Sequence, residues 1–271
     1  MLLGCDFSSA PTRRKPIVVA TGFLNQAGTG VRLNGLLSFS SLQAWGDWLQ
    51  EQPAWIGGFD FPFSLPRELV EHLSWPGTWP EPIAHYAGLD RSEIRRLFAA
   101  FCAARPAGGK FAHRATDGPA GSSPSMKWVN PPVAYMLHAG VPRLLAAGAA
   151  FPGLYTPTHG TGRVALEAYP GLLARELIGR RSYKSDDKAR QTPERRLARA
   201  ELVARLAAGQ RRLGLSLDLA PDQIEPLLED ASSDAIDAAL CLVQAAWASQ
   251  RAPDFGLPTA IDPLEGWIVT A

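Results

Sequence analysis

Residues 1–10 read MLLGCDFSSA, a short apolar run that stops at an acid and two serines. Such a run is typical of a buried β-strand, so we expect a strand that ends at Asp6. A carboxylate at the end of a buried strand is costly to remove from water unless it is paired or binds a cation. Asp6 is therefore the first candidate site residue.

The segments that follow extend this strand into a sheet. PIVVATGF (16–23) and VRLNGLLSFS (31–40) predict two strands that form a hairpin antiparallel to the first. SSLQAWGDWLQEQ (40–52) predicts a helix with a serine cap. AWIGGFDFPFSLP (54–66) predicts a fourth strand that ends on a second carboxylate, Asp60.

Residues 62–162 have a different composition, rich in Pro, Gly and Trp, with helices expected over 91–104 and 132–149. No repeat and no second core pattern is visible there. We interpret 62–162 as an insertion within one domain that spans 1–271. RVALEAYP (163–170) then predicts a fifth strand with Glu167 near its end.

Two helical segments dominate the rest of the chain. TPERRLARAELVARLAAG (192–209) begins with threonine and proline, as helices often do. SSDAIDAALCLVQAAWASQ (232–250) predicts a long apolar helix capped by one of its leading serines. Asp234 and Asp237 share one face of its first turn. Because the rest of this helix is apolar nearly all round, we expect it to pack on the sheet with both acids near the strand ends.

These acids form one candidate catalytic cluster: Asp6, Asp60, Asp234, Asp237 and Glu167. Several carboxylates in one pocket do not stay ionised together unless a cation neutralises them. Carboxylate ligands favour Mg²⁺ or Mn²⁺, and we expect the four aspartates to hold the metal. A pair of such ions activates water and stabilises a phosphoryl displacement, which predicts a metal-dependent phosphodiesterase.

Most of the acids also have a structural alternative. Asp6 and Asp60 both precede residues that fit a turn. Asp234 fits the first turn of any helix. Glu167 is equally well explained as a metal ligand or as the partner of an arginine. Asp237 lies deeper in an apolar helix and is harder to explain in this way.

The motifs taken together resemble one family. In chain order they are GCDFSSA (4–10), IGGFDFPFSLP (56–66), FAHRATDG (111–118), LEAYPG (166–171), SYKS (182–185) and SDAIDAALC (233–241). This set resembles the family called domain of unknown function 429, which is described as predicted ribonuclease H-like nucleases. DAIDAAL also looks like the last acidic helix of Holliday-junction resolvases, which often carry Glu where this chain has Asp60.

The resemblance implies an α/β fold with a ribonuclease H-like mixed five-stranded sheet flanked by helices. The implied strand order is third, second, first, fourth, fifth, with a long helical and loop insertion after the fourth strand. It also implies nuclease activity in which Asp6 bridges two metal ions while Asp60 and Asp237 each hold one. Asp234 would complete a coordination shell or orient water.

Basic residues supply candidate substrate contacts. Arg114 and Lys184 lie in two of these motifs, and Arg13 and Arg14 lie in the loop after the first strand. Positive groups of this kind offset the charge of a polyanionic substrate, although a salt bridge explains Arg114 and Lys184 equally well.

The amino-acid composition indicates a globular protein but does not indicate its substrate. The chain has 271 residues, 46% hydrophobic and 20% charged, and a net charge of +1, which fits a globular protein. Its three cysteines form no metal-binding motif, and no apolar run is long enough for a membrane span. We expect a soluble cytoplasmic protein whose partner is nucleic acid, either DNA or RNA. The alternatives are a non-catalytic nucleic-acid or protein-binding module with the same fold and, last, an actin-like ATPase.

Overall fold

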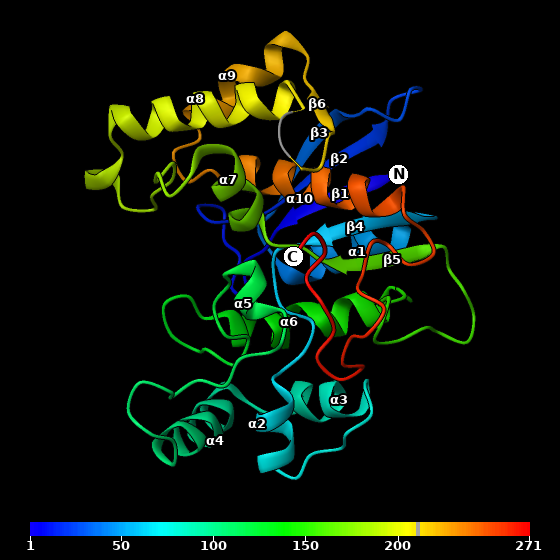
Figure 1. Cartoon of the computed structure of the whole chain (residues 1–271), viewed down its shortest axis with the longest axis vertical. Coiled ribbons are helices and arrows are strands. Elements are labelled where there is room, and N and C mark those ends of the chain that lie inside the picture. Colours follow the sequence, from blue (N-terminus) through cyan, green and yellow to red (C-terminus); the bar gives the residue numbers. More distant parts are fainter. Residues whose placement is uncertain (210–211) are drawn as a thin grey trace.

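The computed structural model describes residues 1–209 and 212–271 and has an α/β architecture. A mixed six-stranded sheet runs through it in the order β5-β4-β1-β2-β3-β6 (Figure 1). The strands are β1 (Leu2–Asp6), β2 (Ile17–Leu24), β3 (Gly30–Phe39), β4 (Trp55–Phe59), β5 (Arg163–Glu167) and β6 (Ser216–Asp218). Strands β1, β2 and β3 are antiparallel neighbours, and β1–β4, β4–β5 and β3–β6 are parallel pairs.

The expected order of the first five strands is confirmed, but the expected number of strands is wrong. The sixth strand, β6, pairs with Gly30–Arg32 at the start of β3. It has only three residues and one buried side chain, Leu217, so its sequence carries no alternation that identifies a strand. Its conformation is set by the edge of β3 beside it.

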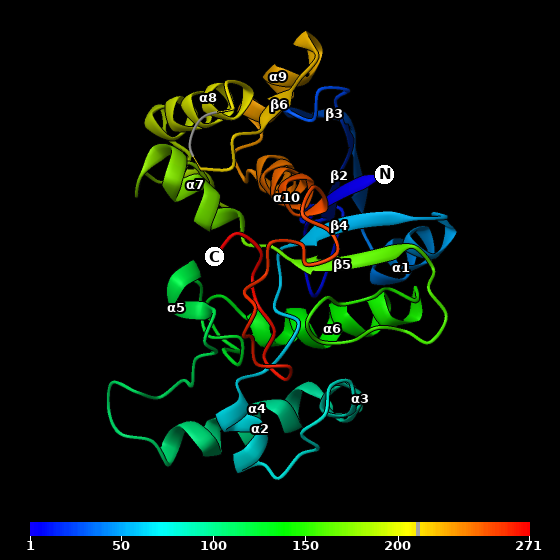
Figure 2. The same cartoon turned by 45° about the vertical axis from the view of Figure 1, so that its right-hand side comes forward.

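Helices cover both faces of the sheet. The helices of the described residues are α1 (Leu42–Glu51), α2 (Arg67–His72), α3 (Glu81–Ala87), α4 (Arg91–Ala103), α5 (Asp117–Ala120), α6 (Val133–Ala146), α7 (Pro170–Ile178), α8 (Pro193–Ala207), α9 (Pro221–Glu229) and α10 (Asp234–Ser249), with a 3₁₀ turn, η1 (Lys188–Arg190). Helices α7–α10 lie on one side of the sheet, and α1 and α6 lie on the other (Figures 1 and 2). Helices α2–α4 extend beyond α6 at the far end of the molecule.

The segment between β4 and β5 holds α2–α6, where the sequence predicts an insertion. Its buried aromatic residues Tyr86 and Phe98 belong to the same hydrophobic cluster as Trp45 of α1 and Phe59 of β4. The insertion therefore packs on the sheet through a shared core.

Helix α10 contacts the sheet at two glycines. A Cβ atom on Gly4 would lie 2.1 Å from the carbonyl oxygen of Ala238, and one on Gly58 would lie 2.6 Å from that of Cys241. Side chains alternate along a strand, so Asp6 and Asp60 point to the same face as these glycines. The face that carries α10 is therefore also the face toward which both strand-end acids point.

None of the helices in the described part of the chain is long and apolar enough to cross a membrane. Cys5, Cys102 and Cys241 are buried and form no disulfide.

The close approach of α10 predicts that Gly4→Ala lowers the free energy of unfolding by about 2–3 kcal/mol or more, because the new methyl group meets backbone atoms that must move. Gly35→Ala in β3 is the matched control, since its Cβ would meet nothing closer than 3.9 Å. We expect the control to change stability by less than about 0.5 kcal/mol. Urea unfolding measures both, and equal losses would contradict the packing described.

Candidate active site

Asp6 and Asp60 lie side by side at the carboxyl ends of two parallel strands. Cys5 of β1 pairs with Phe59 of β4, and the backbone N–H of Asp60 donates to the carbonyl of Cys5 at 2.9 Å. Each acid is the residue directly after such a pair. In open α/β sheets, ligands bind in the crevice outside the carboxyl ends of the strands.

Asp234 and Asp237 reach the same region from the first turn of α10. The turn before the helix is fixed by Ser233, whose φ is +62°, and by Asp230, whose carboxylate accepts the N–H of Ala235 at 3.0 Å. The expected serine therefore stands at the helix boundary, but its hydroxyl does not cap the helix. The carboxylate of Asp230 does so instead.

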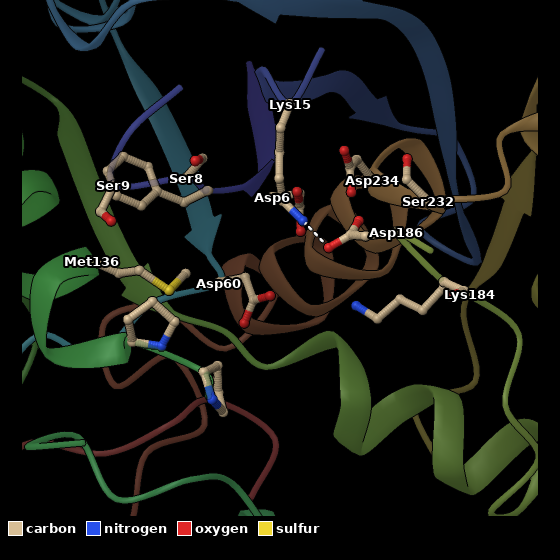
Figure 3. Close-up of a pocket in the computed structure, with 14 residues that line it drawn as sticks. Asp6, Ser8, Ser9, Lys15, Asp60, Met136, Lys184, Asp186, Ser232 and Asp234 are labelled. Atoms are coloured by element: carbon tan, nitrogen blue, oxygen red, sulfur yellow. Dashed lines mark hydrogen bonds and ion pairs between the residues drawn. The ribbon is translucent and has the colours of Figure 1, made fainter. Parts of the chain in front are cut away.

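A cavity of about 430 Å³ opens above these strand ends, and we call it the acid cavity. Figure 3 shows Asp6, Asp60 and Asp234 around one space, with Lys184 extending into it from another side. Ser8 and Ser9 line the same cavity. In the described residues, no hydrogen-bond donor reaches the carboxylates of Asp6, Asp60 or Asp234.

The acid cavity disfavours negative charge. Burial and the neighbouring aspartates 237, 234 and 60 raise the pKa of Asp6 well above its usual value. Burial raises the pKa of Asp60 to about 7 against the opposing effect of Lys184, and burial raises that of Asp234 to about 6. The positive charge of Lys184 therefore does not offset the burial of these acids, which is the condition that favours a bound cation.

Asp237 is the one aspartate of the four that is fully enclosed by protein. The hydroxyl of Tyr183 donates to one of its oxygens at 2.6 Å, and the amine of Lys184 forms an ion pair with the other. Tyr183 is a contact of the candidate site that no pattern in the sequence identifies, although the motif SYKS contains it. Lys184 is close enough to influence Asp6 and Asp60 as well.

Glu167 lies on the neighbouring strand but belongs to a different network. It pairs with Phe59, one residue before Asp60, so it points to the opposite face of the sheet from Asp6 and Asp60. Both of its oxygens accept bonds from Arg114, at 2.6 and 2.7 Å, and one also accepts the N–H of Phe63 at 3.0 Å. Of the two explanations open for Glu167, the structure supports the partner of an arginine.

Arg114 is correspondingly buried, with 1% of its side chain exposed. It also bonds to Asp117 at 3.0 Å, so the guanidinium is shared between two acids. Of the two explanations for Arg114, the salt bridge therefore describes its position.

Arg13 and Arg14 are exposed in the loop between β1 and β2. The same loop carries Lys15, which lines the acid cavity and forms an ion pair with Asp186 (Figure 3). Substrate contact by Arg13 and Arg14 stays a prediction.

The donor set fits a hard divalent cation in its chemistry, since it offers carboxylate oxygens and three of the four carboxylates lack a partner in the described chain. The positions of these carboxylates fit a metal less well than their chemistry does. Within residues 1–209 and 212–271, no three His, Cys, Asp or Glu side chains are arranged to hold one metal ion. The ion pair with Lys184 occupies Asp237, so metal binding there requires Lys184 to move.

Comparison with protein-family models, with curated proteins and with solved structures gave no match to this chain.

The raised pKa of Asp60 predicts a pH-dependent stability. The folded protein holds this proton up to about pH 7, whereas the unfolded chain releases it near pH 3.8. The preference of the folded protein for protonated Asp60 thus contributes fully to the free energy of unfolding below about pH 4. This contribution is lost as the pH rises to about 7. Because Asp60 is partly exposed and solvent screens its charge, we expect this contribution to the free energy of unfolding to be roughly 1–2 kcal/mol.

Urea unfolding at several pH values, in EDTA, measures this effect by comparing wild type with Asp60→Asn. The variant should show a smaller decline in stability between pH 4 and 7. Identical pH profiles would show that Asp60 does not titrate in this way.

The network around Arg114 predicts a purely structural effect. Arg114→Met leaves Glu167 and Asp117 buried without their cation, so the free energy of unfolding should fall by roughly 3–5 kcal/mol. Arg95→Met, at an exposed position of α4, is the control and should have little effect. An Arg114→Met protein as stable as wild type would overturn the structural role.

Proposed function

We propose that this chain is a divalent-metal-dependent hydrolase of nucleic-acid phosphodiester bonds with a ribonuclease H-like fold. The observation that carries the proposal is that Asp6, Asp60 and Asp234 line one cavity from three separate elements, with the buried Asp237 close enough to influence Asp6. The strand order β5-β4-β1-β2-β3 is compatible with that fold.

The four aspartates are the residues that would hold Mg²⁺ or Mn²⁺. The chemistry supplied by bound divalent ions is activation of water and neutralisation of charge on the phosphate. The raised pKa values of Asp6, Asp60 and Asp234 support this assignment, because a bound ion would neutralise charge that their surroundings disfavour.

Lys184 provides the positive charge of the cavity in the absence of metal. Its amine lies among the same carboxylates, and 47% of its side chain is exposed. Once displaced from Asp237, this flexible amine can bind a phosphate oxygen. The sequence interpretation of Lys184 as a phosphate contact thus remains part of the proposal.

A non-catalytic binding module is the second candidate. The ion pair and hydrogen bond that occupy both oxygens of Asp237 favour it, because they satisfy this carboxylate without a metal. The two candidates differ in whether activity requires the acids.

We expect the wild-type protein to cleave at least one of branched DNA, an RNA–DNA hybrid, single-stranded RNA or single-stranded DNA when Mg²⁺ or Mn²⁺ is present, and not in EDTA. Asp6→Asn and Asp237→Asn should each lower the rate at least about 100-fold, since even groups outside the first coordination shell cost 10–100-fold. Gel analysis of labelled substrates measures the cleavage.

Asp222→Asn, at an exposed position of α9, is the matched control and should retain the wild-type rate. Cleavage that survives equally in Asp6→Asn and Asp237→Asn would place the reaction elsewhere. Binding without cleavage of any substrate would favour the binding module.

A further inference from the structure

Three cavities meet at Asp60 and Lys184. Besides the acid cavity there is an apolar cavity of about 320 Å³, which includes Val133, Met136 and Ile268 in its wall. A basic cavity of about 470 Å³ is lined by Arg175, Arg180 and Arg181. Because Asp60 and Lys184 line all three, a ligand whose reacting group lies between them can extend into each cavity.

The apolar cavity suits a flat group of moderate size. Its volume lies at the lower end of the range for small-molecule sites, about 300–1,000 Å³. Of its four charged residues, Arg114 and Glu167 pair with each other, and Asp60 and Lys184 stand where this cavity meets the other two. The hydroxyls of Ser122 and Ser123 add polar groups at its wall. This combination is that of a site for a nucleobase.

The basic cavity suits phosphate. Arg180 is exposed two residues after the end of α7, and in the described residues no carboxylate pairs with it. The guanidinium of Arg181 pairs with Glu201, and that of Arg175 donates to the carbonyl of Ala120. The acid cavity shares Asp60 and Lys184 with this one, so a cavity lined by acids and a cavity lined by arginines meet at the same two residues.

Tyr169 stands between the apolar and basic cavities and lines both. The guanidinium of Arg175 lies 5.3 Å from the centre of its ring. Gly171 supports another part of the ring, since a Cβ atom at that position would lie 2.8 Å from it. The ring is thus held in place but is only half-buried. A fixed, partly exposed aromatic ring is suited to stacking against a base.

We infer that the substrate presents an unpaired nucleotide from single-stranded nucleic acid, with its base in the apolar cavity against Tyr169 and its neighbouring phosphates in the basic cavity. The inference rests on the proposed function, because it places the phosphodiester between Asp60 and Lys184. A base inside a duplex is stacked and paired, so it cannot enter such a cavity without leaving the helix.

Fluorescence anisotropy with a labelled 20-nucleotide strand tests this inference, with DNA and RNA strands as separate arms and their duplexes as competitors. Measurements in EDTA keep binding separate from cleavage. Wild type should bind at least one single strand about tenfold or more tightly than its duplex. Tyr169→Leu should weaken that binding roughly 5- to 100-fold, while Tyr169→Phe, which keeps the ring, should retain it.

Tyr135→Leu is the matched control, because Tyr135 also carries an arginine over its ring, at 4.9 Å, but does not line the three cavities. It should bind like wild type. Duplex binding as tight as single-strand binding, or Tyr169→Leu binding like wild type, would overturn the inference. If either of these results is accompanied by metal-dependent cleavage of duplexes, the proposed function stands and only the single-strand inference fails. The failure of the inference can therefore be distinguished from the failure of the proposed function.

Discussion

Helix α10 lies so close to β1 and β4 that its backbone occupies the space where side chains at Gly4 and Gly58 would be. This contact fixes the height of the helix above the sheet, and with it the position of the first helical turn. Asp234 and Asp237 are consequently held over the strand ends that carry Asp6 and Asp60. Close packing of protein interiors makes such a contact sensitive to a single methyl group. The two glycines thus connect the packing of the core to the geometry of the site.

The alternation of side chains along the strands separates two kinds of charge. Acids on the α10 face share a cavity with too little positive charge, and their pKa values rise in response. Glu167, on the opposite face, forms an ion pair with Arg114 of the insertion. It also accepts a hydrogen bond from the loop after β4. One face therefore carries buried carboxylates with raised pKa values, while the carboxylate on the other face is paired with an arginine.

The sequence predicts most of the sheet because its strands are apolar and bounded by turns, and it predicts α10 because the apolar residues continue for four turns. The same patterns locate the four aspartates at element ends. They also place Glu167 at the end of β5, but they do not give the face toward which it points, since that depends on the pairing register of β5 with β4 and no local pattern encodes that register. Strand β6 and the bond from Tyr183 to Asp237 were missed for a similar reason, because both are set by contacts between residues distant in the chain.

Diffraction from crystals grown with Mn²⁺, recorded at a wavelength where manganese scatters anomalously, observes the metal site directly. We expect an anomalous difference peak in the acid cavity, within coordination distance of carboxylate oxygens of Asp6, Asp60 and Asp237, with Lys184 moved away from Asp237. Manganese bound only elsewhere on the protein, with the Lys184–Asp237 ion pair intact, would contradict this expectation.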